Sequence, residues 1–436
     1  MPPEFTIRIG LAALLLAAVP ACGSDATPPA EPTPTVLVAH HSRGKVEATS
    51  DLIDRIVKGG VATWRPLDGS SDRLRVGRTT RDVTGNPNTV AVIPAARLSP
   101  WVRAIVVDGV DPTRRPLTGT GPVTTLRVVG DIMLGRGVAA ANPGRDPVAP
   151  LRHLHRHLAG ADLTVGNLES TLSDDGQPRQ GADSFAAPPD VAAGLADLGV
   201  DAVSLANNHT GDFGEGALLD TLRVLRGSRL AAFGAGADLA EASRPVVLEN
   251  AGVRFGFIGF NAIGETPRAT ADTPGALSIR MPPRTGPLNE ADLAHVERLV
   301  RRLKARVDVV VVIPHWGAQY THAPVPVQSL VAGRLAAAGA DLVAGGHPHW
   351  VQGIERAGDA VVAHSLGNLV FDMDFAEQTM QGVTLTATFW GARLVGVELA
   401  PYRMDARFAP RLIDGAAAQD VLDDVWAAST GPFSGP

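Results

Sequence analysis

Two histidines, His347 and His349, stand on either side of Pro348, and two glycines separate them from the apolar run at residues 342–344. Neutral imidazole is the commonest side-chain ligand for metal ions in proteins. Because a residue before proline favours extended backbone, and residues two apart in an extended chain face the same way, we expect both rings to project to one side. The turn is therefore predicted to supply a pair of metal ligands.

Other polar side chains follow short apolar runs in the same manner. They are Asp131, Asn167, Glu169, Asn207, Asn208, His209 and His315. Ligand sites of open α/β sheets lie just beyond the carboxyl ends of the strands. Carboxylate, amide oxygen and imidazole together suit a hard-to-borderline divalent ion, and two ions about 3.5–4 Å apart need a shared carboxylate. The set as a whole predicts a metal centre.

Each residue taken alone has a simpler explanation. Asp131 could form an Asx turn, Asn208 could cap the helix that follows it, and His315 could be an ordinary core histidine. A short motif carries a high risk of a false match. The metal hypothesis therefore depends on the joint occurrence of these residues at successive strand ends.

The surrounding chain alternates short β-branched runs with amphipathic helices. Strands are predicted at residues 124–130, 161–166, 201–206, 307–314 and 340–345, and helices at 213–227, 288–305 and 327–339. An apolar stripe along the helix at 288–305 should cover a sheet. Residues 244–260 predict a hairpin, and residues 382–399 predict an antiparallel hairpin at a sheet edge. This order predicts a mixed α/β sandwich of two sheets with helices outside.

The N-terminus is typical of an export signal. From Ile9 to Ala21 the chain carries no charge, and thirteen residues are too few for a bilayer span, which takes about 20. We therefore expect a signal peptide at 1–21. Cys22, the only cysteine, stands where a bacterial lipoprotein is lipidated, and a plainly cleaved signal peptide is the alternative. The expected location is the outer face of the cytoplasmic membrane or outside the cell.

The remaining segments are assigned by composition. Residues 22–35 form a proline-rich linker, 36–118 a small α/β domain that faintly resembles half of a periplasmic binding fold, and 119–405 the main domain. Residues 406–436 predict a helix and a frayed tail. His40 and His41, at the end of the strand expected from residue 35, are interpreted as a surface pair.

Composition excludes some classes of protein. The formal net charge of −6 over 436 residues gives no reason to expect a nucleic-acid surface, and one cysteine cannot form a disulfide framework. A cluster of three histidines at 153–157 looks metal-like but has no carboxylate or strand end beside it. We interpret His153, His155 and His157 as part of a basic surface helix.

Six segments occur together in one order: "GDIMLGR" at 130–136, "GNLES" at 166–170, "ANNHTGDFGEGALLDTL" at 206–222, "HWGAQY" at 315–320, "GGHPHWVQ" at 345–352 and "SLGNLVFD" at 365–372. With these motifs the chain from about 124 to 400 resembles the CapA family of poly-gamma-glutamate (capsule) biosynthesis proteins, within the calcineurin-like metallophosphoesterase superfamily. The resemblance implies a four-layer αββα sandwich of the metallo-dependent phosphatase type.

The resemblance also implies roles for the residues. Asp131 and His349 would hold a first divalent metal ion, and Asn208, His315 and His347 would hold a second. The carboxylate of Glu169 would bridge the two ions. His209 would protonate the leaving group or stabilise the transition-state charge. Supporting roles would fall to Asn167, Asn207, Gln319 and Asn368. The cofactor would be one or two ions of Mn, Zn, Fe or Mg.

Two residues depart from the patterns of these proteins. Met133 replaces the imidazole of the usual Asp-x-His, and Gln319 stands where CapA proteins usually have glutamate. The implied function is that of an exported surface protein of capsule or poly-gamma-glutamate biosynthesis, with metal-hydroxide hydrolysis or transfer on a phosphoester or gamma-glutamyl polymer. The alternative is a non-catalytic protein that binds or retains an anionic surface polymer. Expected partners are that substrate, the membrane through a lipid anchor, and other capsule-synthesis proteins, without nucleic acid.

Overall fold

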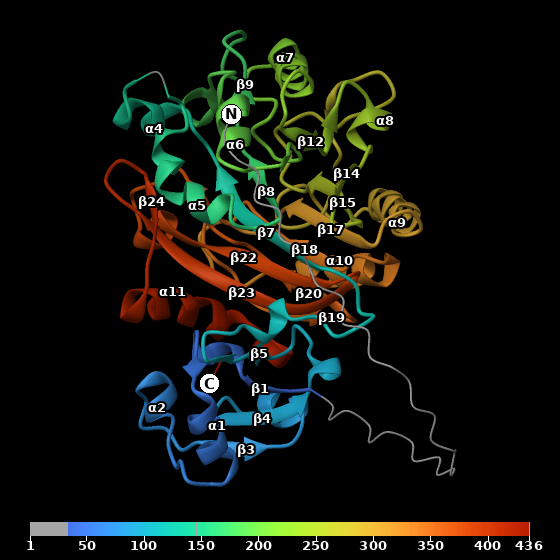
Figure 1. Cartoon of the computed structure of the whole chain (residues 1–436). Coiled ribbons are helices and arrows are strands. Elements are labelled where there is room, and N and C mark those ends of the chain that lie inside the picture. Colours follow the sequence, from blue (N-terminus) through green and yellow to red (C-terminus); the bar gives the residue numbers. More distant parts are fainter. Residues whose placement is uncertain (1–33, 145, 436) are drawn as a thin grey trace, which may run out of the picture. The chain divides into compact units, whose positions relative to one another are not determined.

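Two large β-sheets form the centre of the protein (Figure 1). The structure is a computed structural model, and it describes residues 34–144 and 146–435. The expected signal peptide, Cys22 and nearly all of the linker lie outside the described residues. No helix among the described residues has both the length and the apolar character that crossing a bilayer requires.

The first sheet has eight strands, of which seven run in the order β12-β11-β8-β7-β22-β23-β24, with β21 paired to β7. Their bounds are β7 Val123–Ile132, β8 Leu163–Leu168, β11 Ala202–Ser204, β12 Ala231–Phe233, β21 Asn368–Val370, β22 Gln381–Trp390, β23 Arg393–Met404 and β24 Pro410–Leu412. The strands β7, β8, β11 and β12 are parallel to one another, so their carboxyl ends meet at one edge.

The second sheet has six strands in the order β14-β15-β17-β18-β20-β19. They are β14 Val246–Asn250, β15 Val253–Asn261, β17 Val309–His315, β18 Leu342–Ala344, β19 Ile354–Ala357 and β20 Ala360–Ala363. The central strands β15, β17, β18 and β20 are parallel. The predicted hairpin at 244–260 is confirmed, because β14 and β15 pair antiparallel.

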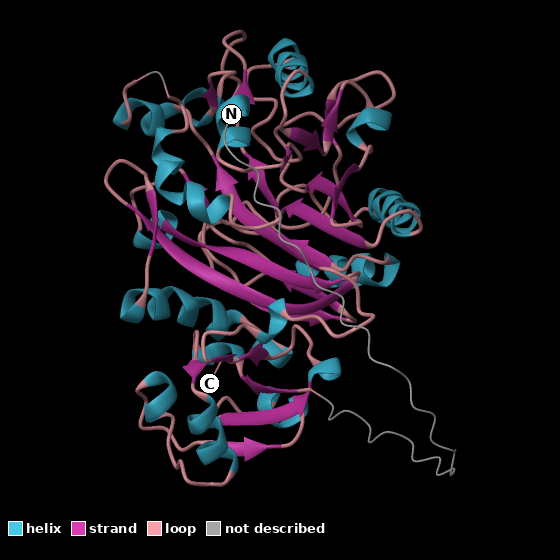
Figure 2. Ribbon diagram, viewed as in Figure 1, coloured by secondary structure: helices cyan, strands magenta, loops and turns pink. Residues whose placement is uncertain are grey.

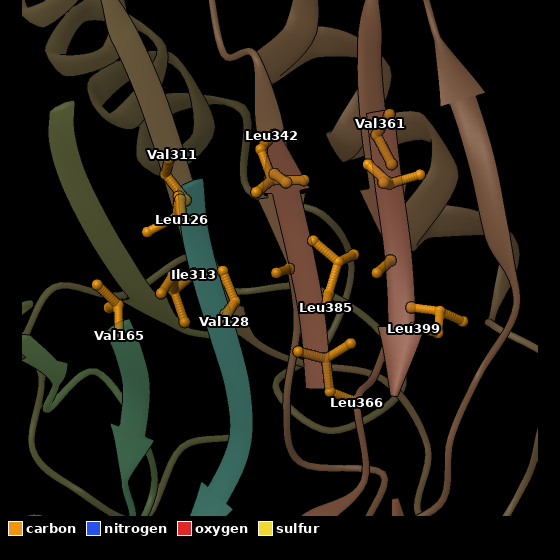
Figure 3. Close-up of a cluster of buried hydrophobic side chains, with 14 of the residues drawn as sticks. Leu126, Val128, Val165, Val311, Ile313, Leu342, Val361, Leu366, Leu385 and Leu399 are labelled. Carbon is orange, nitrogen blue, oxygen red and sulfur yellow. The ribbon is translucent and has the colours of Figure 1, made fainter. Parts of the chain in front are cut away.

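Apolar side chains from both sheets interdigitate in one core. Leu126, Val165 and Leu385 come from the first sheet, and Val311 and Leu342 come from the second; all are at most 5% exposed (Figure 3). β-branched residues dominate the parallel strands because both faces of such a strand are buried. This core holds the two sheets face to face.

Helices cover the outer face of each sheet (Figure 2). On the first sheet they are α4 Arg136–Ala141, α5 His155–Leu158, α6 Val191–Asp197 and α7 Glu215–Arg226, and on the second α8 Leu239–Ala242, α9 Glu290–Lys304 and α10 Pro326–Ala338. The predicted stripe of α9, from Leu293 to Leu303, is buried against the second sheet. The predicted four-layer αββα sandwich is therefore confirmed.

The predicted hairpin at 382–399 forms as β22 and β23, but its edge position is wrong. β22 pairs with β7 on one side, and β23 pairs with β24 on the other. The strand β24 was missed because three residues ending in the exposed Leu412 give almost no alternation to detect. The hairpin therefore lies inside the first sheet.

Residues 34–118 fold around a four-stranded sheet in the order β3-β4-β1-β5. Its strands are β1 Thr35–Ala39, β3 Arg75–Gly77, β4 Thr89–Pro94 and β5 Arg103–Ala104. A separate pair is formed by β2 Glu47–Ala48 and β6 Val106–Val107. The helices are α1 Ser50–Val57, α2 Arg65–Asp68 and α3 Thr80–Thr84. The strand β1 is antiparallel to both of its neighbours, β4 and β5.

The interpretation of His40 and His41 as a surface pair is wrong. They are 0% and 1% exposed. The Nε2 atom of His41 lies 2.9 Å from the carbonyl oxygen of Pro100, and its ring centroid lies 4.9 Å from that of Phe433. Phe433 follows helix α11, Gly415–Ala428, and is itself buried, so the C-terminal tail is packed rather than frayed.

Candidate metal centre

The predicted ligand residues meet where five strands of the two sheets end. Asp131 lies near the end of β7, Asn167 near the end of β8, and His315 is the last residue of β17. Loops after β11 and β18 carry the asparagine-histidine segment at 207–209 and the histidine pair at 347–349. An isolated bridge between His315 and Gly346 joins two of these strand ends.

Asp131 and Asn167 form the hydrogen-bonded base of the cluster. Asn167 Nδ2 donates to Asp131 Oδ1 at 2.8 Å and lies 3.4 Å from Glu169 Oε2. The backbone N–H of His347 donates to Asp131 Oδ2 at 3.0 Å. Asn207 Nδ2 in turn donates to Asn167 Oδ1 at 3.0 Å. The two asparagines therefore orient the carboxylates.

Three histidines and two asparagines lie around Glu169 and Asp131. His315 Nε2 lies 2.8 Å from Asn208 Oδ1 and 3.5 Å from Glu169 Oε1. His349 Nδ1 lies 3.9 Å from Asp131 Oδ2 and 2.9 Å from the Oδ1 of Asn368, which β21 places beside β7. The ring centroid of His347 lies 5.0 Å from that of His315.

The donor set fits a divalent cation. Ligand atoms of Asp131, Glu169 and His349 all lie within 4.8 Å of one another, and these side chains are buried. Glu169 Oε1 and both ring nitrogens of His347 are buried without a hydrogen-bond partner among the described residues. Buried polar atoms are almost always paired, so these atoms indicate a ligand that would satisfy them.

The electrostatics of the cluster favour the same kind of ligand. Burial, together with the neighbouring Glu169 carboxylate, raises the pKa of Asp131 to about 7. Burial lowers the pKa of His315 to about 4 and that of His347 well below its ordinary value. The imidazoles therefore stay neutral and cannot balance two carboxylates, whereas a cation would.

The histidine turn has a conformation that differs from the predicted one. His347 and His349 have φ angles of +93° and +58°, in the left-handed region, and not the extended backbone expected before Pro348. Such angles cost a non-glycine residue about 1–3 kcal/mol and persist where the surroundings impose them. The two rings nevertheless converge, with centroids 5.9 Å apart.

His209 lies at the rim of the carboxylates. Its Nδ1 is 2.7 Å from Asp212 Oδ2, and its Nε2 is 3.7 Å from Glu169 Oε1. Phe185 stacks on the ring with centroids 3.7 Å apart, and the guanidinium of Arg136 lies 4.2 Å from the centre of the Phe185 ring. Asp212, Phe185 and Arg136 were missed, although Asp212 and Arg136 stand inside the motifs quoted above.

Other predicted residues lie apart from the cluster. Met133 is buried in the apolar layer under α4 to α7, where its sulfur accepts from the N–H of Gly135 at 3.1 Å. Within the described residues, no hydrogen bond joins Gln319 to the cluster. His153 and His155 are exposed, and His157 Nε2 lies 2.8 Å from Thr384 Oγ1. The three histidines are thus separate from the metal centre, as expected.

Comparison with known proteins identifies the family. A model of the family described as bacterial capsule synthesis protein PGA_cap matches residues 125–373, more than half of the chain. Capsule biosynthesis protein CapA of Bacillus anthracis is 33% identical over 255 residues, which cover 57% of this chain and 60% of that protein. PGA biosynthesis protein CapA of Bacillus subtilis is 29% identical over 265 residues, covering 60% and 66%. The match spans less than two thirds of either Bacillus protein.

Solved structures are more distant. A hypothetical protein from Thermus thermophilus is 16% identical with a TM-score of 0.41, covering 64% of this chain and 99% of that one. NAD nucleotidase of Haemophilus influenzae is 11% identical with a TM-score of 0.39, covering 71% and 63%. The family match and the CapA relatives, by contrast, confirm the resemblance that the motifs indicated: this chain belongs to the bacterial capsule synthesis protein (PGA_cap) family.

Proposed function

We propose that this protein acts in capsule or poly-gamma-glutamate biosynthesis at the cell surface, as a hydrolase or transferase that uses a divalent metal ion. Its substrate would be a phosphoester or a gamma-glutamyl polymer. The CapA relatives support the biosynthetic context, because their names state capsule and PGA biosynthesis. The chemistry is inferred from the buried cluster.

One observation carries the proposal. Glu169 Oε1 and the two ring nitrogens of His347 are buried without a hydrogen-bond partner in the part of the chain that the structure describes, beside a second carboxylate whose pKa burial raises. Asp131, Glu169 and His349 would hold one divalent ion, and Asn208, His315 and His347 would hold another. When bound, such an ion acts as a Lewis acid toward a carbonyl or phosphoryl oxygen and lowers the pKa of water.

The proton chemistry would fall to His209. A carboxylate only accepts hydrogen bonds, so the contact with Asp212 assigns the hydrogen of Nδ1 and leaves Nε2 facing the cluster. In the protonated ring, Nε2–H would donate a proton to the leaving oxygen or nitrogen. Phe185 stacks on the His209 ring, which holds the orientation of the ring and excludes water from one of its faces.

The test uses the full chain, purified and dialysed against excess Mn²⁺ or Zn²⁺. We expect bound metal by elemental analysis and hydrolysis of a generic phosphoester or of poly-gamma-glutamate. Glu169→Gln should lose metal, whereas His209→Ala should keep the metal and lose turnover by about 10²-fold or more. Failure of the wild-type chain to retain any divalent ion would refute the metal centre.

A binding role without catalysis is the second candidate. Met133 lies in the apolar layer instead of the cluster, and Gln319 contributes no charge at the position where a base would stand. Metal retention and tight binding of poly-gamma-glutamate, with the polymer length unchanged after long incubation, would support this candidate over the hydrolase.

The location of the protein is a separate proposal. We infer export by the segment at 1–21 and anchoring through a lipid on Cys22, with residues 22–35 as a spacer before the folded part. Residues 36–118, 119–405 and 406–436 would then form the exported body. Membrane fractionation tests this, because Cys22→Ser should release the protein from the membrane fraction if the lipid anchors it.

A further inference from the structure

A polar cavity lies apart from the metal centre, and none of the metal-centre residues lines it. It has a volume of about 210 Å³ and lies between β5 of the small sheet and β23 of the first large sheet. The N–H of Trp390 donates to the carbonyl oxygen of Thr113 at 2.7 Å beside it, which ties the two parts together. Its charged lining consists of Lys45, Glu47, Arg103, Asp111, Arg114 and Glu398.

Three of these six charges already have partners. Lys45 Nζ lies 4.0 Å from Glu47 Oε1. Asp111 Oδ1 accepts from the N–H and the hydroxyl of Thr113 at 2.9 and 2.7 Å. Among the described residues, no ion pair within 4.0 Å involves the other three, which are Arg103, Arg114 and Glu398.

Among the charged residues that line the cavity, Arg103 is the one with a buried polar atom that lacks a partner. Its Nε atom is buried and has no hydrogen-bond partner among the described residues. Arg127, which does not line the cavity, lies on β7 opposite Thr386 of β22. It is only 7% exposed, and its guanidinium donates to Thr386 Oγ1 and to the carbonyl oxygen of His157 rather than to a carboxylate. Arg103 as a whole is half-buried, but a guanidinium with a buried, unpaired N–H is costly, so an anion that reaches this group from the cavity would be stabilised.

Glu398 restricts which anion can enter. Its side chain is exposed to the cavity, and it is the carboxylate that acts on both Arg103 and Arg127 from beyond ion-pair distance. A plain anion would be repelled by it, whereas an ammonium group would be attracted. A planar guanidinium binds carboxylates in a bidentate manner. The cavity therefore offers two guanidinium groups, of Arg103 and Arg114, and the carboxylate of Glu398. A ligand with two carboxylates and one ammonium group has the complementary charges.

We propose that this cavity binds a small acidic α-amino acid, with its carboxylates on Arg103 and Arg114 and its ammonium on Glu398. The volume of about 210 Å³ lies below the roughly 300–1,000 Å³ of pockets for drug-sized ligands, so a polymer does not fit inside it. None of the metal-centre residues lines the cavity, so this inference is independent of the proposed hydrolase activity.

The test is calorimetric titration of the full chain with L-glutamate, glutarate and inorganic phosphate, supported by thermal unfolding. We expect saturable binding of L-glutamate and a rise in Tm of about 2–5 °C at saturation. Glutarate lacks the ammonium group and should bind at least tenfold more weakly. Equal binding of glutarate, stronger binding of phosphate, or no heat with any of the three would overturn the proposal.

Variants locate the binding. Arg103→Met keeps the apolar stem and removes the charge, so L-glutamate binding should be lost, while Arg97→Met, an exposed arginine outside the cavity, should leave it unchanged. Glu398→Gln alters only an exposed side chain, so this variant provides a second test if Arg103→Met folds poorly. It should abolish the preference for L-glutamate over glutarate, and a preference that survives this change contradicts the assignment.

Discussion

His209 Nδ1 lies 2.7 Å from Asp212 Oδ2, so one carboxylate fixes both the tautomer and the orientation of the ring that faces Glu169. The same carboxylate is held from two other directions. The N–H of Phe185 donates to its Oδ2 at 2.7 Å, and Gln180 Nε2 donates to its Oδ1. Asp212 is therefore a positioning residue for His209.

Asp212→Asn should lower turnover by about 10²-fold or more with little change in KM, because the imidazolium loses its stabilising charge while substrate contacts remain. The asparagine oxygen can still accept from Phe185 N–H, and the Gln180 amide can rotate to accept from the new NH₂ group, losing only its long 3.3 Å hydrogen bond to the carbonyl oxygen of Asn208. We therefore expect normal folding by circular dichroism and unchanged metal content. Steady-state kinetics on the metal-loaded protein provide the measurement.

The matched control is Asp174→Asn, an exposed carboxylate in the neighbouring loop, which should leave turnover unchanged. Unaltered kcat in Asp212→Asn would show that the contact does not serve the reaction. Loss of bound metal in that variant would instead assign Asp212 to the metal centre.

Leu342 tests the core between the sheets. It is 0% exposed on β18 and packs with residues of both sheets (Figure 3). Leu342→Ala should lower the free energy of unfolding by about 2–5 kcal/mol, because the removed methyl groups leave a cavity that the strands cannot close. Leu330 on α10 is 53% exposed, so Leu330→Ala should change the free energy of unfolding by less than about 0.5 kcal/mol. Urea titrations measure both, and equal effects would contradict the assigned core.

His41 makes stability depend on pH outside the metal centre. Burial, together with the positive charge of Arg103, lowers the pKa of His41 from its ordinary value of 6.5 to about 3. The folded state keeps this ring neutral, so its contribution to stability is complete above pH 6.5 and is lost as the pH falls from 6.5 toward 3. The loss is at most about 1.4 kcal/mol for each pH unit.

His41→Gln keeps an N–H donor for the carbonyl oxygen of Pro100 and removes the titrating group. The free energy of unfolding, measured at pH 7, 5.5 and 4.5, should therefore fall less steeply in this variant than in the wild-type chain. His155→Gln, an exposed histidine, should leave the slope unchanged. Parallel slopes for all three proteins would mean that His41 takes up its proton as readily in the folded state as in the unfolded state.

The sequence was sufficient for those parts of the fold that local patterns determine. The β-branched runs before Asp131 and His315 predicted strands of an α/β sheet, whose ligand sites lie beyond the carboxyl ends of the strands. The composition of the cluster could be predicted for this reason, without any knowledge of distances. The stripe of α9 likewise needed only the helical period.

Long-range packing decided the features that were missed. His41 is buried because Phe433, almost four hundred positions away, packs on its ring. The left-handed backbone of His347 and His349 overrides the local preference before Pro348, since the neighbouring strand ends fix the turn. Phe185 beside His209 carries no motif, and only the folded chain reveals the contact.

Gly346 shows how tightly the metal centre is built, and it yields the last prediction. A Cβ atom at this position would lie 2.2 Å from Asp131 Oδ1, far inside contact distance. The backbone of Gly346 cannot retreat, because its N–H donates to Pro314 and its carbonyl oxygen accepts from Trp316, at 3.0 and 3.1 Å. Gly346→Ala must therefore displace the Asp131 carboxylate.

We expect Gly346→Ala to weaken metal binding by about 10–100-fold and to destabilise the fold by about 1–3 kcal/mol. Gly333→Ala on α10 is the matched control. A Cβ atom there meets nothing within 4 Å, so the substitution should stabilise the helix by about 0.5–1 kcal/mol and leave metal content unchanged. If Gly346→Ala bound metal as tightly as the wild-type chain, Asp131 would have no part in holding the ion, because the substitution cannot leave that carboxylate in place.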